Sequence, residues 1–216
     1  TDSHNTAVGN LAGYAVTTGQ YNTLIGGSSG DAITDADENV AVGYNSLSTN
    51  TLGNRTVAIG TGALRDQNYT TATDSFNTAV GHAAGLLVTT GIKNTLIGGL
   101  AGDAITVGAD NVALGYTSLG TNVGGAGNVA IGAQALQEAN PGATPSATYN
   151  TAVGYKAGLL VTTGIQNTLV GGLAGDALTD ADFNTAVGMV ALSSDTLGSK
   201  STALGYAALE AQNFTT

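Results

Sequence analysis

The sequence predicts an all-β protein: a parallel β-solenoid of twelve short coils. Three observations support this prediction. A five-residue motif recurs about every 17 residues, every copy ends in glycine, and each copy alternates side chains as a β-strand does. Seventeen residues is short for a helical repeat, and a glycine in each copy would destabilise a helix by about 1 kcal/mol per site. Stacked coils with short strands therefore explain the repeat better than helices.

The motif has the form Asn-(Thr/Val)-(Ala/Leu)-(Val/Ile/Leu)-Gly and opens each of twelve units. The units begin at Asn5, Asn22, Asn39, Thr56, Asn77, Asn94, Asn111, Asn128, Asn150, Asn167, Asn184 and Ser201. All steps are 17 residues long, except steps of 21 and 22 residues after Thr56 and Asn128. The chain is therefore one repetitive domain in three sets of four coils, residues 1–76, 77–149 and 150–216.

The first five positions of each unit predict a strand followed by a corner. The second and fourth positions point to one side of the strand, and the small third position points to the other. The fifth position is always glycine, which predicts a corner with positive φ or close approach of another backbone. These structural corner residues are Gly9, Gly26, Gly43, Gly60, Gly81, Gly98, Gly115, Gly132, Gly154, Gly171, Gly188 and Gly205.

Equivalent positions of successive coils are expected to stack about 4.8 Å apart, so that twelve coils form a rod of about 58 Å. In such a stack the first-position asparagines bond to one another, as side-chain amides do in cross-β ladders. The aliphatic fourth position is expected to form an apolar spine inside the coil. A charge inside such a column would be unfavourable, in agreement with a charged content of only 9%.

The remaining positions of the unit predict turns and an interface. The eighth position is always Ala or Ser, the ninth cycles Gly, Gly, Leu, Leu within each set, and Thr-Thr-Gly or Leu-Gly makes the next turn. With the fourth position inside the coil, the third and eighth columns would form a smooth apolar outer face. Because an exposed apolar face indicates an interface, we expect several chains to pack side by side, most simply as a homotrimer.

The composition excludes several classes of function. The 216 residues carry a formal net charge of −10 with only five basic residues, so a nucleic acid partner is not expected. The absence of cysteine excludes disulfides and thiolate chemistry. The apolar runs are too short to span a membrane. An apolar content of 42% is too high for a disordered low-complexity tract.

The two ends of the sequence match parts of a long step. Residues 211–216 resemble residues 66–71, and residues 1–9 resemble residues 73–81. Neither end has the sequence of a polar capping coil, which a solenoid needs where stacking stops. We therefore expect this chain to be a segment of a longer array, continued in the same chain or by end-to-end stacking of identical chains.

The repeat also resembles known families. Asn-Thr-Ala-Val-Gly, Asn-Val-Ala-Val-Gly and Val-Ala-Ile-Gly resemble the head repeats of trimeric autotransporter adhesins. Thr-Thr-Gly-x-x-Asn-Thr-Leu-Ile-Gly-Gly-x-Ala-Gly, at residues 89–102, resembles the 17-residue repeats of phage tail-fibre proteins. The resemblance covers all twelve units. It implies a left-handed β-roll, a homotrimer, a location outside the cell or on a virion, and a role in attachment.

Catalytic residues are not expected. His4 and His82 occupy different columns of the repeat, and no serine or acid recurs beside them. The five basic residues are scattered rather than gathered along a groove. A polysaccharide-acting β-helix enzyme is therefore a distant alternative.

Acidic residues cluster in the second coil of the outer sets, where Asp35 and Asp37, and Asp180 and Asp182, lie two residues apart. Such pairs on a turn are weak candidates for calcium, which takes six to eight oxygen ligands. The middle set keeps only Asp110, and turn and capping roles explain the same residues. We therefore expect no bound metal and no cofactor.

The two long steps, around residues 65–76 and 137–149, predict loops on one face of the solenoid. Their polar residues with an exposed aromatic suit weak contact with a cell-surface glycan, whereas a spacer or a trimer-locking loop is the alternative. The candidate receptor contacts are Asn68, Tyr69, Phe76, Asn140 and Tyr149.

Taken together, these patterns predict a non-enzymatic extracellular fibre that functions in attachment, as an adhesin or a tail-fibre shaft. The alternative is a structural surface filament that assembles without binding a receptor. Flat ranks of threonine would suit ice binding, but aliphatic residues share the same face and valine often replaces the threonine.

Overall fold

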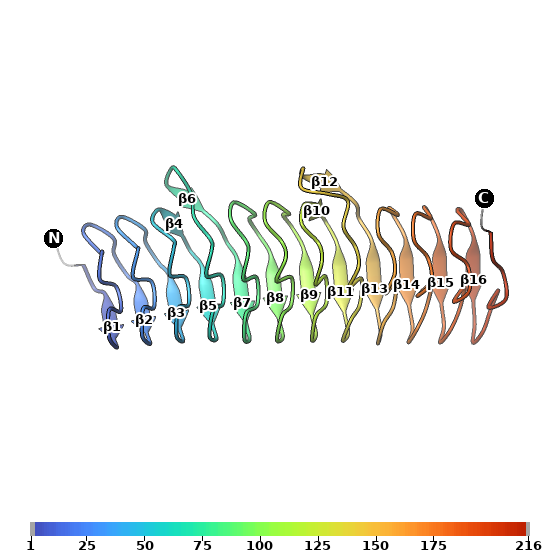
Figure 1. Ribbon diagram of the computed structural model, residues 1–216, viewed down its shortest axis with the longest axis horizontal. Helices are drawn as coiled ribbons and strands as arrows, with labels where there is room; N and C mark the ends of the chain where they lie inside the picture. Colours follow the sequence, from blue (N-terminus) through green and yellow to red (C-terminus); the bar gives the residue numbers. More distant parts are fainter. Residues whose placement is uncertain (1–2, 215–216) are drawn as a thin grey trace.

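The computed structural model describes residues 3–214 and confirms the parallel β-solenoid with twelve coils of about 17 residues (Figure 1). Each coil contributes one short strand to a single twelve-stranded parallel sheet that runs along the rod. No residue between 3 and 214 is helical, so this part of the chain has no helix that could cross a membrane.

The long sheet contains twelve three-residue strands. These are β1 (Thr6–Val8), β2 (Thr23–Ile25), β3 (Val40–Val42), β5 (Val57–Ile59), β7 (Thr78–Val80), β8 (Thr95–Ile97), β9 (Val112–Leu114), β11 (Val129–Ile131), β13 (Thr151–Val153), β14 (Thr168–Val170), β15 (Thr185–Val187) and β16 (Thr202–Leu204). Two further pairs are β4 (Gly53–Asn54) with β6 (Thr73–Asp74), and β10 (Gly125–Ala126) with β12 (Ser146–Ala147).

The register of the long sheet follows the repeat without interruption. Thr6 pairs with Thr23, and the long steps keep the same register, with Val57 opposite Thr78 and Val129 opposite Thr151. The additional residues of the long steps leave the coil at its edge, where β6 and β12 project above the neighbouring coils (Figure 1). The insertions therefore leave the stack continuous.

The structure reverses the expected inner and outer faces of the strand. The third-position residues Leu24, Leu96 and Leu169 are fully buried, whereas fourth-position residues such as Val8 and Leu114 are 58% and 42% exposed. The alternation of side chains along the strand was correct, but the aliphatic fourth column lies outside the coil. The coil is too narrow to enclose branched side chains from two positions of one strand, and it encloses the single third column instead.

Size complementarity explains the cycling third and ninth positions. Wherever the third position is leucine, the ninth is glycine, as in Leu24 with Gly30. A Cβ atom added to Gly30 would lie 2.7 Å from Cδ2 of Leu24, too close for any carbon pair. The coils with alanine at the third position and leucine at the ninth, such as Leu47 and Leu64, fill the same space from the opposite wall. The first coil of each set is small at both positions, and at Gly85 the space is taken by Leu64 and Leu96 of the neighbouring coils.

The asparagine column forms a buried ladder along the rod. The side chain of Asn94 accepts hydrogen bonds from the backbone N–H and the amide of Asn111, both at 3.1 Å, and donates to the carbonyl of Gly108 at 2.9 Å. The same three bonds recur from coil to coil through most of the stack. Each buried amide is thus fully used, which a polar group inside a coil requires.

Where the asparagine of the ladder is missing, a buried glutamine from the same coil makes hydrogen bonds in its place. In the coil that begins with Thr56, Gln67 donates to the Thr56 hydroxyl at 2.9 Å and accepts from the Asn77 amide at 2.8 Å. Gln212 likewise donates to the hydroxyl of Ser201 at 2.9 Å. The fourth coil of the middle set keeps its asparagine, Asn128, and has Ala139 at the position of the glutamine. The two positions therefore vary together for a physical reason.

The twelve fifth-position glycines have φ between +124° and +143°. Gly98 shows why no other residue fits, because a Cβ atom there would lie 2.6 Å from the carbonyl oxygen of Gly115 in the next coil. Both the backbone conformation and the close approach of the next coil require glycine.

The expectation that the array continues beyond this chain rests partly on residues 1–2 and 215–216, which lie outside the described residues.

Candidate functional site: an apolar ribbon and a surface pocket

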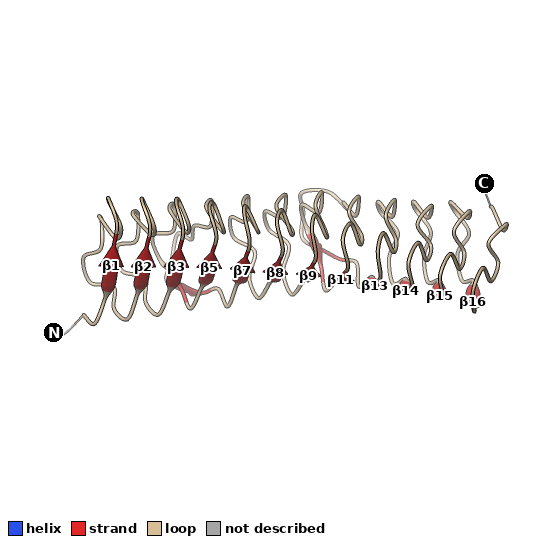
Figure 2. Cartoon of the chain, turned by 90° about the horizontal axis from the view of Figure 1, so that it is seen from below, coloured by secondary structure: helices blue, strands red, loops and turns tan. Residues whose placement is uncertain are grey.

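The outward face of the long sheet is a continuous surface of Thr, Val, Ile and Leu side chains, which we call the strand ribbon. It consists of the second and fourth positions of every coil, and Figure 2 shows the strands that carry them in a row along the rod. Its second column is Thr6, Thr23, Val40, Val57, Thr78, Thr95, Val112, Val129, Thr151, Thr168, Thr185 and Thr202. Its fourth column is Val8, Ile25, Val42, Ile59, Val80, Ile97, Leu114, Ile131, Val153, Val170, Val187 and Leu204.

The strand ribbon holds no charged or amide side chain over its whole length. Eleven steps of about 4.8 Å make it about 53 Å long, and strands of three residues make it about 10 Å wide. Sixteen of its 24 side chains are apolar and the other eight are threonine. A continuous, mainly apolar face of about 500 Å² reaches the size at which exposed patches on soluble proteins indicate an interaction surface. The ribbon is thus the main candidate surface for assembly.

The expected interface on the third and eighth columns is wrong. Ala113 and Ala130 of the third column are fully buried within their own coil. Ser29 and Ser46 of the eighth column are also buried, and their hydroxyl oxygens lie 3.1 Å apart in a hydrogen bond. These small side chains fill the interior of the coil rather than its outer face, so they are not available to another chain.

The first long step contains one buried and two exposed candidate receptor contacts. Tyr69 is only 6% exposed and its hydroxyl donates to the carbonyl of Gly91 at 2.9 Å, so its assignment as a receptor contact is corrected. Burial raises the pKa of Tyr69 to about 12. Asn68 is exposed, but its side-chain oxygen accepts a hydrogen bond of 2.7 Å from the hydroxyl of Thr51. Phe76 is 51% exposed.

In the second long step both candidates are exposed. The Asn140 side chain accepts a hydrogen bond from the backbone N–H of Gly142 at 3.0 Å and shapes its own loop. Tyr149 is 57% exposed and its ring packs over Gly127, where a Cβ atom would lie 2.5 Å from the ring. Tyr149 and Phe76 are the last residues of their units, directly before the next motif, and do not lie at the tip of a loop.

The aspartates that were weak calcium candidates each bond to the coil before them. Asp37 accepts from the backbone N–H of Gln20 at 2.7 Å, and Asp182 from that of Ile165 at 2.8 Å. Asp35 and Asp180 accept from the hydroxyls of Thr18 and Thr163. Within residues 3–214, no three His, Cys, Asp or Glu side chains are grouped so as to hold a metal ion.

A second set of aspartates is half-buried on the wall of the coil. Burial raises the pKa of the Asp103 and Asp176 carboxyl groups above the ordinary value. In Asp31 and Asp176, one carboxylate oxygen is buried without a hydrogen-bond partner. The raised pKa values mean that Asp103 and Asp176 destabilise the fold when they are charged, so stability depends on pH.

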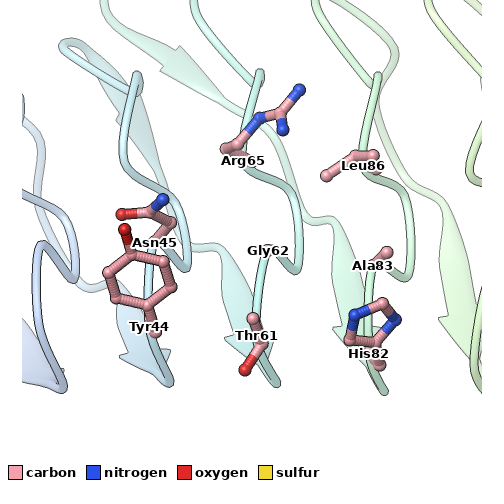
Figure 3. A pocket seen from close by; sticks show the side chains of 8 residues that line it. All are labelled: Tyr44, Asn45, Thr61, Gly62, Arg65, His82, Ala83 and Leu86. Atoms are coloured by element: carbon pink, nitrogen blue, oxygen red, sulfur yellow. The ribbon is translucent and has the colours of Figure 1, made fainter.

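A pocket of about 290 Å³ opens on the surface that follows the corner glycines, across three successive coils (Figure 3). It is lined by Tyr44, Asn45, Thr61, Gly62, Arg65, His82, Ala83 and Leu86. Tyr44 is 60% exposed and comes from one coil, and His82 occupies the same position two coils further on. Thr61 and Gly62 lie between them at the floor of the pocket (Figure 3).

The sequence interpretation passed over this pocket, although the repeat contains a signal for it. Gly62 is the only glycine at the seventh position of the twelve units, and Arg65 is the only basic residue at the tenth. His82 was considered only as a catalytic residue and set aside, whereas the structure brings it to the same hollow as Tyr44 and Arg65. The second histidine, His4, lies elsewhere and stacks on Tyr21 with ring centroids 5.4 Å apart.

Comparison of the chain with family models, with curated proteins and with solved structures finds no match in any of the three.

Proposed function

We propose that the protein is a non-enzymatic extracellular fibre that functions in attachment, and that its chains associate along the strand ribbon as a homotrimer of left-handed coils. The observation that carries this proposal is the ribbon itself, twelve coils long and made only of Thr, Val, Ile and Leu. Folding of a single chain does not require the outward face to be restricted to these residues, because other columns already fill the interior of the coil. Burial of this face between chains explains the restriction.

A trimer matches the dimensions of the ribbon. Sheets that pack face to face lie about 10 Å apart, and the ribbon is about 10 Å wide. Three ribbons placed around one axis enclose a narrow triangular core, in which each ribbon contacts both of the others. One apolar face per chain is then sufficient for a closed assembly with cyclic symmetry. The adhesin-like and tail-fibre-like repeats of the sequence support the same arrangement and the extracellular location.

Assembly is tested by sedimentation velocity on the wild-type protein and on Leu114→Glu, which places a charge in the middle of the ribbon. We expect the wild-type protein to sediment as a species of about 63 kDa, three times the chain mass of 21.1 kDa. Leu114→Glu is expected to be a folded monomer, because each trimer would otherwise bury three unpaired charges.

Leu160→Glu is the matched control for this experiment. Leu160 is 44% exposed, close to the 42% of Leu114, but it lies outside the ribbon. The control variant should remain assembled. A folded wild-type monomer, or equal loss of assembly in both variants, would overturn the proposed trimer.

The second candidate function is a structural filament without a receptor, and the ribbon favours it as well because lateral packing serves both. Electron microscopy of negatively stained protein, together with a cell-adherence assay, separates the two candidates. Finite rods that adhere to cells support the attachment fibre. Indefinite filaments that do not adhere to cells support the structural filament.

A further inference from the structure

We propose that the pocket between Tyr44 and His82 binds one neutral sugar unit of a surface glycan. The inference rests on the proposed attachment function and gives it a ligand class and a site. The site is on the wall of the rod, and none of the five residues that sequence analysis assigned to receptor contact lines it.

The shape of the pocket fits a single ring. Tyr44 and His82 are two coils apart, about 10 Å along the rod, and the small residues Thr61 and Gly62 lie between them (Figure 3). Van der Waals contact on each side takes about 4 Å, which leaves space for one sugar ring between the two side chains. A volume of about 290 Å³ is at the small end for a ligand pocket, as one sugar unit requires.

The lining offers both kinds of group that a sugar ring needs. Leu86, Ala83 and the ring of Tyr44 form an apolar surface for the C–H face of a sugar. His82 and the rim residue Arg65 supply the hydrogen-bonding groups for its hydroxyls. A mainly apolar wall with a few polar groups is the usual composition of a small-molecule site.

The charges around the pocket favour a neutral ligand over an acidic one. The Nε and Nη2 atoms of Arg65 donate to the Asp66 carboxylate at 2.7 and 3.0 Å, which neutralises the guanidinium and fixes its plane. The Nη1 atom of Arg65 has no partner among the described residues and remains a donor at the rim. A donor held in a fixed direction suits a hydroxyl oxygen of the sugar.

The equivalent place at the second long step carries a larger side chain. Tyr116 and Tyr155 flank it, but Gln134 occupies the position of Gly62 and donates to the Gln137 side chain at 2.8 Å. Gln134 has φ of 61° and Gly62 has φ of 69°, so both residues use the same backbone conformation. The repeat therefore shows that glutamine is tolerated in this backbone conformation and adds a side chain where Gly62 has none.

The equivalent residues Gly62 and Gln134 define the two variants of the experiment. Saturation-transfer difference NMR is recorded for the full chain with the methyl glycosides of glucose, galactose, mannose and N-acetylglucosamine. Gly62→Gln is the blocking variant, because a Cβ atom at Gly62 meets only the flexible end of Leu86, at 3.3 Å. Gln134→Gly is the control, since it exchanges the same two residues at the place that is not proposed as a site. Circular dichroism verifies the fold of both variants.

We expect at least one glycoside to bind the wild-type protein, with affinity at least tenfold lower for Gly62→Gln and unchanged or higher for Gln134→Gly. Equal binding by the wild-type protein and Gly62→Gln would overturn the pocket as the site while leaving attachment in place. Binding of none of the four glycosides would overturn this inference. Adherence of that same wild-type protein to cells would then retain the proposed function, and loss of adherence would reject both.

Discussion

Replacement of Gly98 by alanine tests how the corners of the coil hold the stack together. Gly98 has φ of +133°, a conformation that residues with a Cβ atom rarely adopt. The added methyl carbon would lie 2.6 Å from the carbonyl oxygen of Gly115, which is backbone and cannot rotate away. The variant must therefore change the conformation of the corner and separate two coils at the same time.

The expected loss of stability is the sum of these two effects. A strained backbone conformation costs about 1–3 kcal/mol. Separation of the coils weakens the hydrogen bonds from Gly98 N–H to Val80 and from Gly115 N–H to Ile97, both 2.8 Å long. Each is worth about 0.5–1.5 kcal/mol. We therefore expect a loss of about 4 kcal/mol, and a melting temperature lower by roughly 10 °C for a chain of this length.

Thermal unfolding followed by circular dichroism measures this loss, with Gly172→Ala as the matched control. A Cβ atom at Gly172 would meet nothing within 4 Å, and its φ is not in the left-handed range. The control should melt at the wild-type temperature or slightly above it, because alanine restricts the unfolded chain. If both variants melt at the same temperature, the explanation of the corner glycines is refuted.

Three further predictions concern the interior. Gln67→Ala should destabilise the fold by about 2 kcal/mol by leaving buried donors and acceptors unpaired, and adding Thr56→Asn should restore most of it in a double-mutant cycle. Asp103→Asn should raise the melting temperature at pH 7 but not at pH 3, because the raised pKa of Asp103 favours its protonated form in the fold, so wild-type stability falls as pH rises through that pKa. Leu169→Ala should cost about 2–5 kcal/mol in chemical denaturation, because Leu169 is fully buried; a loss below 1 kcal/mol would contradict that packing.

The fold could be predicted from the sequence because the chain repeats its own constraints. Glycine at the fifth position of every unit indicated the corner, and asparagine at the first position indicated the ladder between coils. The register of the sheet follows directly, since each residue pairs with its equivalent one unit later. A period of two along the strand also separated its two faces.

The pattern did not reveal which of the two faces is inside. Alternation separates the two faces of the strand but does not show which of them faces the interior. The larger side chains at the fourth position favoured the wrong face. The correct signal was the pairing of residues across the coil, as in Leu24 with Gly30, since only side chains that share one interior need to exchange volume. Threonine at eight of the twelve second positions was a further sign that this face lies outside the coil.

The candidate site was harder to predict because it depends on three coils at once. The rule that insertions carry the binding residues favoured Tyr69, which in the structure fills the space under its own loop. The pocket arises instead from the small residues at Thr61 and Gly62 beside two larger neighbours. Such a hollow becomes visible only when units are compared position by position along the stack.

Cysteine cross-linking tests the strand ribbon as the assembly surface most directly, because the natural sequence contains no cysteine. Leu114→Cys and Leu160→Cys are oxidised with copper phenanthroline and run on a denaturing gel without reductant. We predict that Leu114→Cys forms a cross-linked pair of about 42 kDa, twice the chain mass of 21.1 kDa, and that Leu160→Cys remains at the mass of one chain. Cross-linking through Leu160→Cys alone, or none through Leu114→Cys, would contradict the ribbon as the contact between chains.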